Sequence, residues 1–126
     1  MNKSLNGIFK IDDISHLNEC LDVIHISFKN RDEKLGFGPT GHSILSYNDF
    51  VKMYENGIQM YGYFLDNKIV GFVSFDIRDN EIKIKDIVVL PKYQNMGLGK
   101  KLLDYVKNFA FENSKSKIGR ASCRER

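Results

Sequence analysis

Hydrophobic positions repeat with two different periods along this chain, and the change of period divides the sequence into helical and extended parts. Between residues 15 and 30, apolar residues recur every three or four positions, which predicts an amphipathic helix whose N-cap is Ser15. From Met60 to Leu90 the period becomes two, which predicts strands. The apolar side of the first helix is formed by Leu17, Leu21, Ile24 and Phe28.

A strand, a loop and a second helix complete the N-terminal part. The segment NGIFKIDD alternates in hydrophobicity and predicts a first strand. The stretch RDEKLGFGPTGHS holds three glycines and a proline and is predicted to be a loop. Ser46 and Asp49 then have capping-box spacing, and Asn56 and Gly57 end the helix that they begin. The apolar side of this second helix consists of Phe50, Met53 and Tyr54.

The central part predicts three consecutive antiparallel strands. The segments MYGYFL, KIVGFVSFDI and EIKIKDIVVL are separated by the turn pairs Asp66-Asn67 and Asp79-Asn80. In the third segment, isoleucines alternate with lysines up to Lys85, and three consecutive apolar residues then break the alternation. A bulge near Asp86 would reconcile the two patterns.

The last helix is predicted to begin near Gly97. Its apolar side consists of Leu98, Leu102, Val106 and Phe109. The predicted order is strand, two helices, three strands and a helix. This order indicates one domain with an α/β fold of the α+β kind, in which helices cover a mixed sheet.

The last nine residues, IGRASCRER, differ from the rest of the chain. They carry three arginines and one glutamate without any periodicity, and codons for them can be written that resemble a widely used short-read sequencing adapter. We therefore interpret residues 118–126 as a non-native tail and residues 1–117 as a C-terminally truncated domain. A genuine basic tail that binds phosphate or membrane is the alternative. Without the tail the net charge falls from +3 to +1, and the argument for a nucleic-acid partner disappears.

Composition excludes few other classes of protein. No run of 18 apolar residues occurs and the N-terminus has no cleavable apolar block, so we expect no membrane partner and a cytoplasmic protein. Cys20 and Cys123 are the only cysteines and lack metal or redox spacing. His16 and Cys20 have ligand spacing on a helix, but two ligands make no zinc site, so we expect no metal.

Two glycines stand where the last strand gives way to the last helix. A helix N-terminus has unbonded N–H groups and a partial positive charge, and Gly97 and Gly99 would let a diphosphate approach this backbone closely. The alternative is that they only ease a tight turn. A Rossmann fingerprint would need glycine where Leu102 stands, and a P-loop would need Ser or Thr where Lys101 stands.

The stretch VVLPKYQNMGLGKKLL resembles the hallmark of the GCN5-related N-acetyltransferases (GNAT), which is Gln/Arg-x-x-Gly-x-Gly/Ala after a strand that ends in a Val-x-Pro-like turn. Gln94, Gly97 and Gly99 are in register with it, and NKIVGFVSF resembles the family's third strand. The resemblance covers residues 6–116. It implies a GNAT-like β-α-α-β-β-β-α order that lacks the fifth strand and the following helix, which often supplies a tyrosine acid.

The resemblance also implies how acetyl-CoA would bind. The N–H groups from Gln94 through Lys100 would hold its diphosphate, and the main chain of Ile87, Val88 and Val89 would pair with its pantetheine arm. One of these amides would face the thioester oxygen, where a fixed donor stabilises developing negative charge. The loop residues implied are Gln94, Asn95, Met96, Gly97, Leu98, Gly99 and Lys100.

The acceptor amine must lose a proton, because an ammonium group of pKa about 10.4 is not nucleophilic at neutral pH. Asp86 is our candidate base, directly or through water, and a bulge residue that satisfies backbone donors is its alternative role. Some relatives use a glutamate at the position of Lys85. His42 is a possible acceptor contact, and Cys20 is expected to pack in the core.

We therefore expect an N-acetyltransferase that moves the acetyl group of acetyl-CoA to a primary amine, on a small molecule or a protein, by direct attack in a ternary complex. The alternative is a non-catalytic acyl-CoA-binding or regulatory module. The chain as given should be inactive or weakly binding alone, with an exposed sheet edge that invites aggregation.

Overall fold

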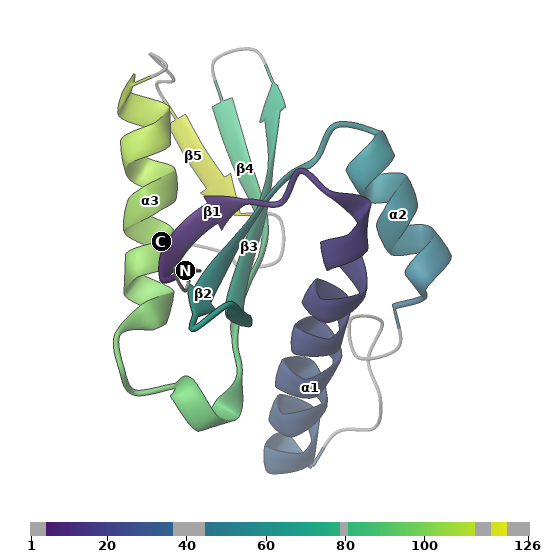
Figure 1. Cartoon of the computed structure of the whole chain (residues 1–126). Coiled ribbons are helices and arrows are strands. Elements are labelled where there is room, and N and C mark those ends of the chain that lie inside the picture. Colours follow the sequence, from purple (N-terminus) through teal and green to yellow (C-terminus); the bar gives the residue numbers. More distant parts are fainter. Residues whose placement is uncertain (1–4, 37–44, 79–80, 113–116, 121–126) are drawn as a thin grey trace, which may run out of the picture.

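The computed structural model describes residues 5–36, 45–78, 81–112 and 117–120 (Figure 1). In chain order its elements are β1 (Gly7–Lys10), the 3-10 helix η1 (Ile14–His16), α1 (Leu17–Leu35), α2 (Tyr47–Glu55), β2 (Gln59–Leu65), β3 (Lys68–Arg78), β4 (Glu81–Val89), the 3-10 helix η2 (Pro91–Tyr93), α3 (Leu98–Glu112) and β5 (Lys117–Arg120). Up to α3 this is the predicted order. The predicted fold class is therefore confirmed.

The strands form one sheet in the order β1-β2-β3-β4-β5. The first four are antiparallel neighbours, whereas β5 runs parallel to β4 and pairs only with residues 81–84. Strand β5 was not expected from the sequence. It consists of Lys117 and the first three residues of the segment interpreted as non-native, and that interpretation stays a prediction.

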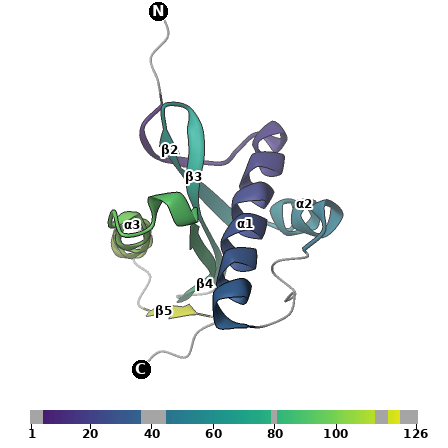
Figure 2. The same cartoon turned by 90° about the horizontal axis from the view of Figure 1, so that it is seen from below.

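Helices cover both faces of the sheet: α1 and α2 lie on one face and α3 on the other (Figures 1 and 2). Each face has its own buried cluster, because strand side chains alternate between faces. The α1-side core includes Leu17, Ile24, Phe50, Met60, Phe72 and Val88. The α3-side core includes Val70, Val73, Ile82, Ile84, Val89, Leu98, Leu102 and Val106. None of the helices in the described part of the chain is long and apolar enough to cross a membrane.

Helix α1 begins and ends later than the sequence predicted. The N-cap at Ser15 is wrong: Asp13 instead caps η1, and its carboxylate accepts the Ser15 N–H at 3.0 Å. Hydrogen bonds from the main chain and the side chain of Ser15 hold the pKa of Asp13 below its usual value. The predicted loop is wrong for residues 31–35, which continue the helix until Gly36 turns the chain with φ +77°. The rest of that loop, residues 37–43, lies outside the described residues.

Helix α2 and the first hairpin turn confirm the predictions. The Ser46 hydroxyl accepts the Asp49 N–H at 3.1 Å, and Asn56 is the C-cap. Asp66 and Asn67 both have positive φ, as a two-residue type I′ turn requires. The turn expected at residues 79–80 lies outside the described residues.

The predicted bulge near Asp86 is present in β4. Ser74 of β3 pairs with Asp86 and its neighbour Phe75 pairs with Ile84, so Lys85 is the extra residue. An extra residue reverses which face each later side chain occupies. Ile82 and Ile84 face α3, and beyond the bulge Val88 faces α1.

Candidate active site

The second half of β4 presents main-chain groups away from β3. The Leu90 N–H donates to the Val70 carbonyl at 2.9 Å. Because antiparallel pairs bond at every second residue, Val88 also faces β3, and the N–H and C=O groups of Ile87 and Val89 point the other way. Strand β5 ends opposite Ile84, so no strand of the described residues lies beside these groups.

The Val89 carbonyl ties this edge to two other elements. It accepts hydrogen bonds from the Ser27 hydroxyl of α1 and from the side-chain amide of Gln94, each at 3.0 Å. Ser27 is buried. The two bonds fix the end of β4 against α1 and against the loop that leads into α3.

The loop between β4 and α3 leads to a helix start with unbonded donors. The N–H of Lys101 donates to the Gly97 carbonyl at 3.1 Å, which is the first main-chain bond of α3. The N–H groups of Leu98, Gly99 and Lys100 precede that bond, and a helix offers them no acceptor. Gln94 differs, because its N–H already donates to the Pro91 carbonyl at 3.3 Å. Its side chain supports Val89 instead.

The fold explains Gly97 but gives no reason for Gly99. Gly97 has φ +79°, a left-handed conformation that disfavours any side chain. Gly99 has no positive φ, and a Cβ atom added there would meet only the Val89 Cγ2 atom, at 4.0 Å. Every other glycine of the described residues up to residue 112 either has a positive φ or, like Gly71 against Leu102 at 3.3 Å, is crowded. The bare backbone at Gly99 therefore fits a ligand that approaches closely.

The positive charge of Lys100, beside the start of α3, forms only a weak, exposed ion pair. The Lys100 ammonium lies 3.0 Å from the Asp104 carboxylate, one turn further along the helix. Exposed pairs of this spacing are worth only about 0.3–0.5 kcal/mol. Lys100 could therefore turn to an incoming anion at little cost.

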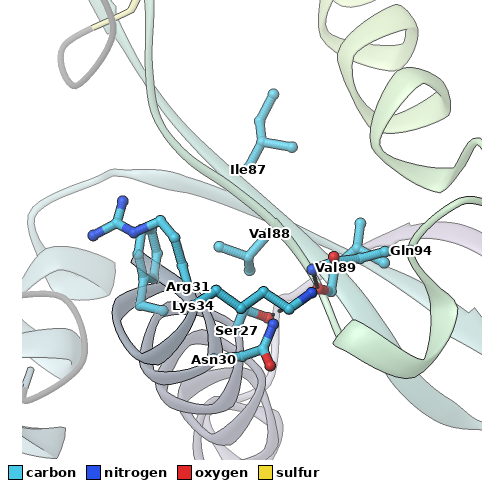
Figure 3. A pocket seen from close by; sticks show the side chains of 9 residues that line it. Ser27, Asn30, Arg31, Lys34, Ile87, Val88, Val89 and Gln94 are labelled. Carbon is cyan, nitrogen blue, oxygen red and sulfur yellow. Dashed lines mark hydrogen bonds between the residues drawn. The ribbon is translucent and has the colours of Figure 1, made fainter. Parts of the chain in front are cut away.

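A cavity of about 320 Å³ opens between α1 and this part of β4 (Figure 3). Its lining residues are Ser27, Phe28, Asn30, Arg31, Lys34, Ile87, Val88, Val89 and Gln94. In Figure 3, Lys34 extends from α1 toward Val89 and Gln94, whereas the Arg31 guanidinium points in the opposite direction. The structure therefore brings four of the predicted cofactor residues to one cavity.

Asp86 lies beside this cavity but not in its lining. Asp86 is 5% exposed, and it pairs across the sheet with Ser74, which is fully buried. The bulge turns the Asp86 side chain toward α1, the face of Val88, and alternation from Phe72 places the Ser74 side chain on the same face. A base at Asp86 would therefore need a water, or a movement of the chain, to reach an amine.

Among the described residues, the other candidate nucleophiles and metal ligands form no second site. Cys20 packs in the core, as expected, and this burial raises the pKa of its thiol to about 12. The thiol is therefore no nucleophile at neutral pH. His25 donates through Nε2 to the Leu45 carbonyl at 2.6 Å. Within the described ranges, no three His, Cys, Asp or Glu residues gather as metal ligands. His42 lies outside the described residues.

The α1 wall of the cavity was not predicted from the sequence, although a signal for it was present. Residues 20, 24, 27, 31 and 34 follow one stripe of the helix, at alternating spacings of four and three. The stripe is buried at Cys20 and Ile24 and turns polar from Ser27 onward. A helix stripe that changes from apolar to polar and basic indicates a face that leaves the core and borders solvent or a ligand.

Residues 26–125 match the profile of the Acetyltransferase (GNAT) family. This is most of the chain, and the chain therefore belongs to that family of acetyltransferases. The match includes α2, all strands after it, the loop at Gly97 and helix α3.

Solved structures of acetyltransferases share the fold. The PaiA N-acetyltransferase of Thermoplasma acidophilum, solved with coenzyme A, has a TM-score of 0.72 at 21% identity, over 86% of this chain and 73% of that one. The ribosomal-protein-S18-alanine N-acetyltransferase of Escherichia coli has a TM-score of 0.72 at 17% identity, over 90% of this chain and 64% of that one. An aminoglycoside acetyltransferase from an uncultured soil metagenomic sample, solved with sisomicin, has a TM-score of 0.65 at 20% identity, over 93% and 77%.

Proposed function

We propose that this chain is the acetyl-CoA-binding part of an N-acetyltransferase that acetylates a primary amine by direct attack in a ternary complex. The observation that carries the proposal is the bare, uncrowded backbone of Gly99 at the start of α3. The N–H groups of residues 95–100 would hold the diphosphate of acetyl-CoA, with those of Leu98, Gly99 and Lys100 donating from the helix end.

The edge of β4 would hold the rest of the donor. The N–H groups of Ile87 and Val89 point to the side where no described strand follows, so a pantetheine arm can pair there as an added strand. Bound acetyl-CoA supplies an activated acyl group. When the amine nitrogen attacks, a carbon–nitrogen bond forms, and a fixed N–H on β4 stabilises the negative oxygen. The carbon–sulfur bond then breaks, and coenzyme A leaves as the thiolate.

The amine's surplus proton would pass to Asp86, directly or through a water. The support for this role is the position of Asp86 at the bulge, on the α1 face beside the cavity. Replacing Asp86 by Asn should lower the rate of acetyl transfer and leave the affinity for coenzyme A unchanged. An equal loss of affinity would assign Asp86 a structural role.

One observation favours a second candidate, a non-catalytic acyl-CoA-binding module. Asp86 is buried, and Lys85 stands where some relatives carry a glutamate that acts as the general base. Thiol release measured across a panel of amines separates the two candidates. Thiol release with any of these amines would contradict the module.

The direct test of the proposal is coenzyme A binding by the Gly99→Leu variant. The Cβ atom of a side chain there meets only Val89 Cγ2, at 4.0 Å, so the fold should survive while the diphosphate is blocked. We expect at least a tenfold loss of affinity by calorimetry, with a melting temperature no lower than that of the unchanged chain. The control is Lys101→Gln, an exposed change two residues away. Equal affinities of Gly99→Leu and the unchanged chain would overturn the proposal.

A further inference from the structure

The buried polar side chains of the described residues gather at one place. They are Ser27 of α1, Ser74 of β3 and Asp86 of β4. All lie on the α1 side of the sheet, around the second half of β4. Ser27 has a clear role there, because its hydroxyl donates to the Val89 carbonyl at 3.0 Å. No such bond explains Ser74.

Ser74 is a polar residue in an apolar stretch of β3. The residues from Phe72 to Phe75 are all buried, and Ser74 is fully buried among them. No described residue forms a hydrogen bond with its Oγ atom. A buried hydroxyl that lacks a partner costs free energy, and an alanine at this position would avoid that cost. The serine therefore indicates a role other than packing.

Asp86 lies directly opposite Ser74 in the sheet. The two residues pair across β3 and β4, and both side chains are on the α1 face. Cβ atoms of such an antiparallel pair are about 4.5–5.5 Å apart, so one side-chain rotation or one bridging water can join a hydroxyl to a carboxylate. A carboxylate offers about four acceptor sites, so Asp86 can accept the Ser74 hydroxyl besides its existing contacts.

We propose that Ser74 is a positioning residue for the base of the reaction: its hydroxyl donates a hydrogen bond to the Asp86 carboxylate, directly or through one water. This inference rests on the proposed function, in which the surplus proton of the amine passes to Asp86. The hydrogen bond fixes the direction of the carboxylate, and Ser74 itself neither gains nor loses a proton. The amine proton then meets an acceptor of constant geometry.

Charged residues around Asp86 also affect its titration. Among the described side chains they are Asp76 of β3, Lys83 and Lys85 of β4, and Arg31 and Lys34 of α1. All of them remain when Ser74 is replaced. The difference between the unchanged chain and a Ser74 variant therefore reports on the hydroxyl.

The test is the titration of the Asp86 carboxyl group, followed by carbon-detected NMR on the isotopically labelled chain. A hydrogen bond to the charged form of a carboxyl group lowers its pKa, so Ser74→Ala should raise the pKa of Asp86. We expect a rise of about one pH unit, which is a tenfold change in proton affinity. An unchanged titration in Ser74→Ala would overturn the inference.

Two further variants separate the hydroxyl from its surroundings. Ser74→Thr keeps a hydroxyl and should titrate within about 0.3 pH unit of the unchanged chain. Ser27→Ala removes the other buried hydroxyl on this side of the sheet and should leave the titration of Asp86 unchanged. A rise in either variant as large as that in Ser74→Ala would mean that packing sets the pKa of Asp86, and the inference would be wrong.

A double-mutant cycle gives a second measurement that needs no NMR signal from Asp86. Ser74→Ala, Asp86→Ala and the double variant are unfolded with urea at neutral pH. If the hydroxyl and the carboxylate interact, the two changes should be coupled by at least about threefold in the unfolding equilibrium constant. Additive changes would contradict the hydrogen bond.

Neither measurement uses coenzyme A, so failure of the inference is distinguishable from failure of the proposed function. If the Ser74 hydroxyl has no effect on Asp86 while coenzyme A binds at the start of α3, only the inference is wrong. If the hydroxyl sets the titration of Asp86 but coenzyme A does not bind, the proposed function fails, and Ser74 positions no catalytic base.

Discussion

The two halves of β4 have the same length of strand but different surroundings. Residues 81–84 pair with β3 on one side and β5 on the other, and Ile82 and Ile84 are buried against α3. Beyond the bulge at Lys85, β4 pairs with β3 alone among the described residues, and its other edge meets a cavity. The first half is built for stability, and the second half keeps its main chain accessible. One extra residue separates these two roles.

Deleting Lys85 should have the largest effect. Without the extra residue, Asp86 would turn into the apolar core under α3 and Val89 would turn away from it. A buried carboxylate without partners is very costly, so we expect a loss of more than about 4 kcal/mol in the free energy of unfolding. Urea denaturation measures it.

The control is Lys85→Ala, which keeps the register and should cost under about 1 kcal/mol. Similar stability of the deletion and the alanine variant would show that the bulge does not set the faces of β4.

Shortening isoleucines should distinguish the halves of the strand. Ile82 is fully buried, so Ile82→Ala should cost about 2–5 kcal/mol. Ile87 is half-buried and lines the cavity, so Ile87→Ala should cost less than half as much and should weaken coenzyme A binding. Chemical denaturation and calorimetry on both variants test the contrast. Equal losses of stability would remove it.

Removing the Ser27 hydroxyl should have a smaller effect on the second half. Ser27→Ala leaves the Val89 carbonyl with one of its two side-chain donors, Gln94. We expect a loss of about 1 kcal/mol, the usual value of one such bond. Asn18→Ala, an exposed change on the same helix, is the control. No loss beyond that of the control would mean that Gln94 alone fixes this carbonyl.

The smallest effect should be a gain. Gly99→Ala places a better helix former where no neighbour is crowded, so it should stabilise the fold by up to about 1 kcal/mol. Gly97→Ala should instead destabilise it by about 1–2 kcal/mol, because a side chain disfavours φ +79°. Thermal melts compare the two. A loss at Gly99 would mean that the fold itself requires this glycine.

Much of the fold could be predicted because local rules and tertiary packing agree there. The hairpin at Asp66-Asn67, the cap at Ser46 and the bulge beside Asp86 each have a short-range chemical signature. The extension of α1 to Leu35 has only the polar stripe through residues 27, 31 and 34 as a signal. Its last turns follow no hydrophobic period, so they resembled a loop. For that reason Arg31 and Lys34 were missed.

The candidate site could be predicted from the sequence only where main-chain groups form it. Gly97 and Gly99 indicated an anion site at a helix start, and the structure distinguishes them by conformation. The open edge at Ile87 and Val89 depends on where β5 ends, and the pairing of distant segments has no signature in a short stretch of sequence. The reach of Asp86 depends likewise on how α1 covers the sheet.

The central claim is that the diphosphate of an acyl-CoA binds the main-chain amides at the start of α3. An amide-resolved NMR titration of the isotopically labelled chain with coenzyme A tests it most directly, and it also detects weak binding. We predict the largest saturable shifts at the N–H groups of Leu98, Gly99 and Lys100, with a second group at Ile87 and Val89. Shifts that are absent at millimolar ligand, or that fall elsewhere and leave these amides unmoved, would contradict the claim.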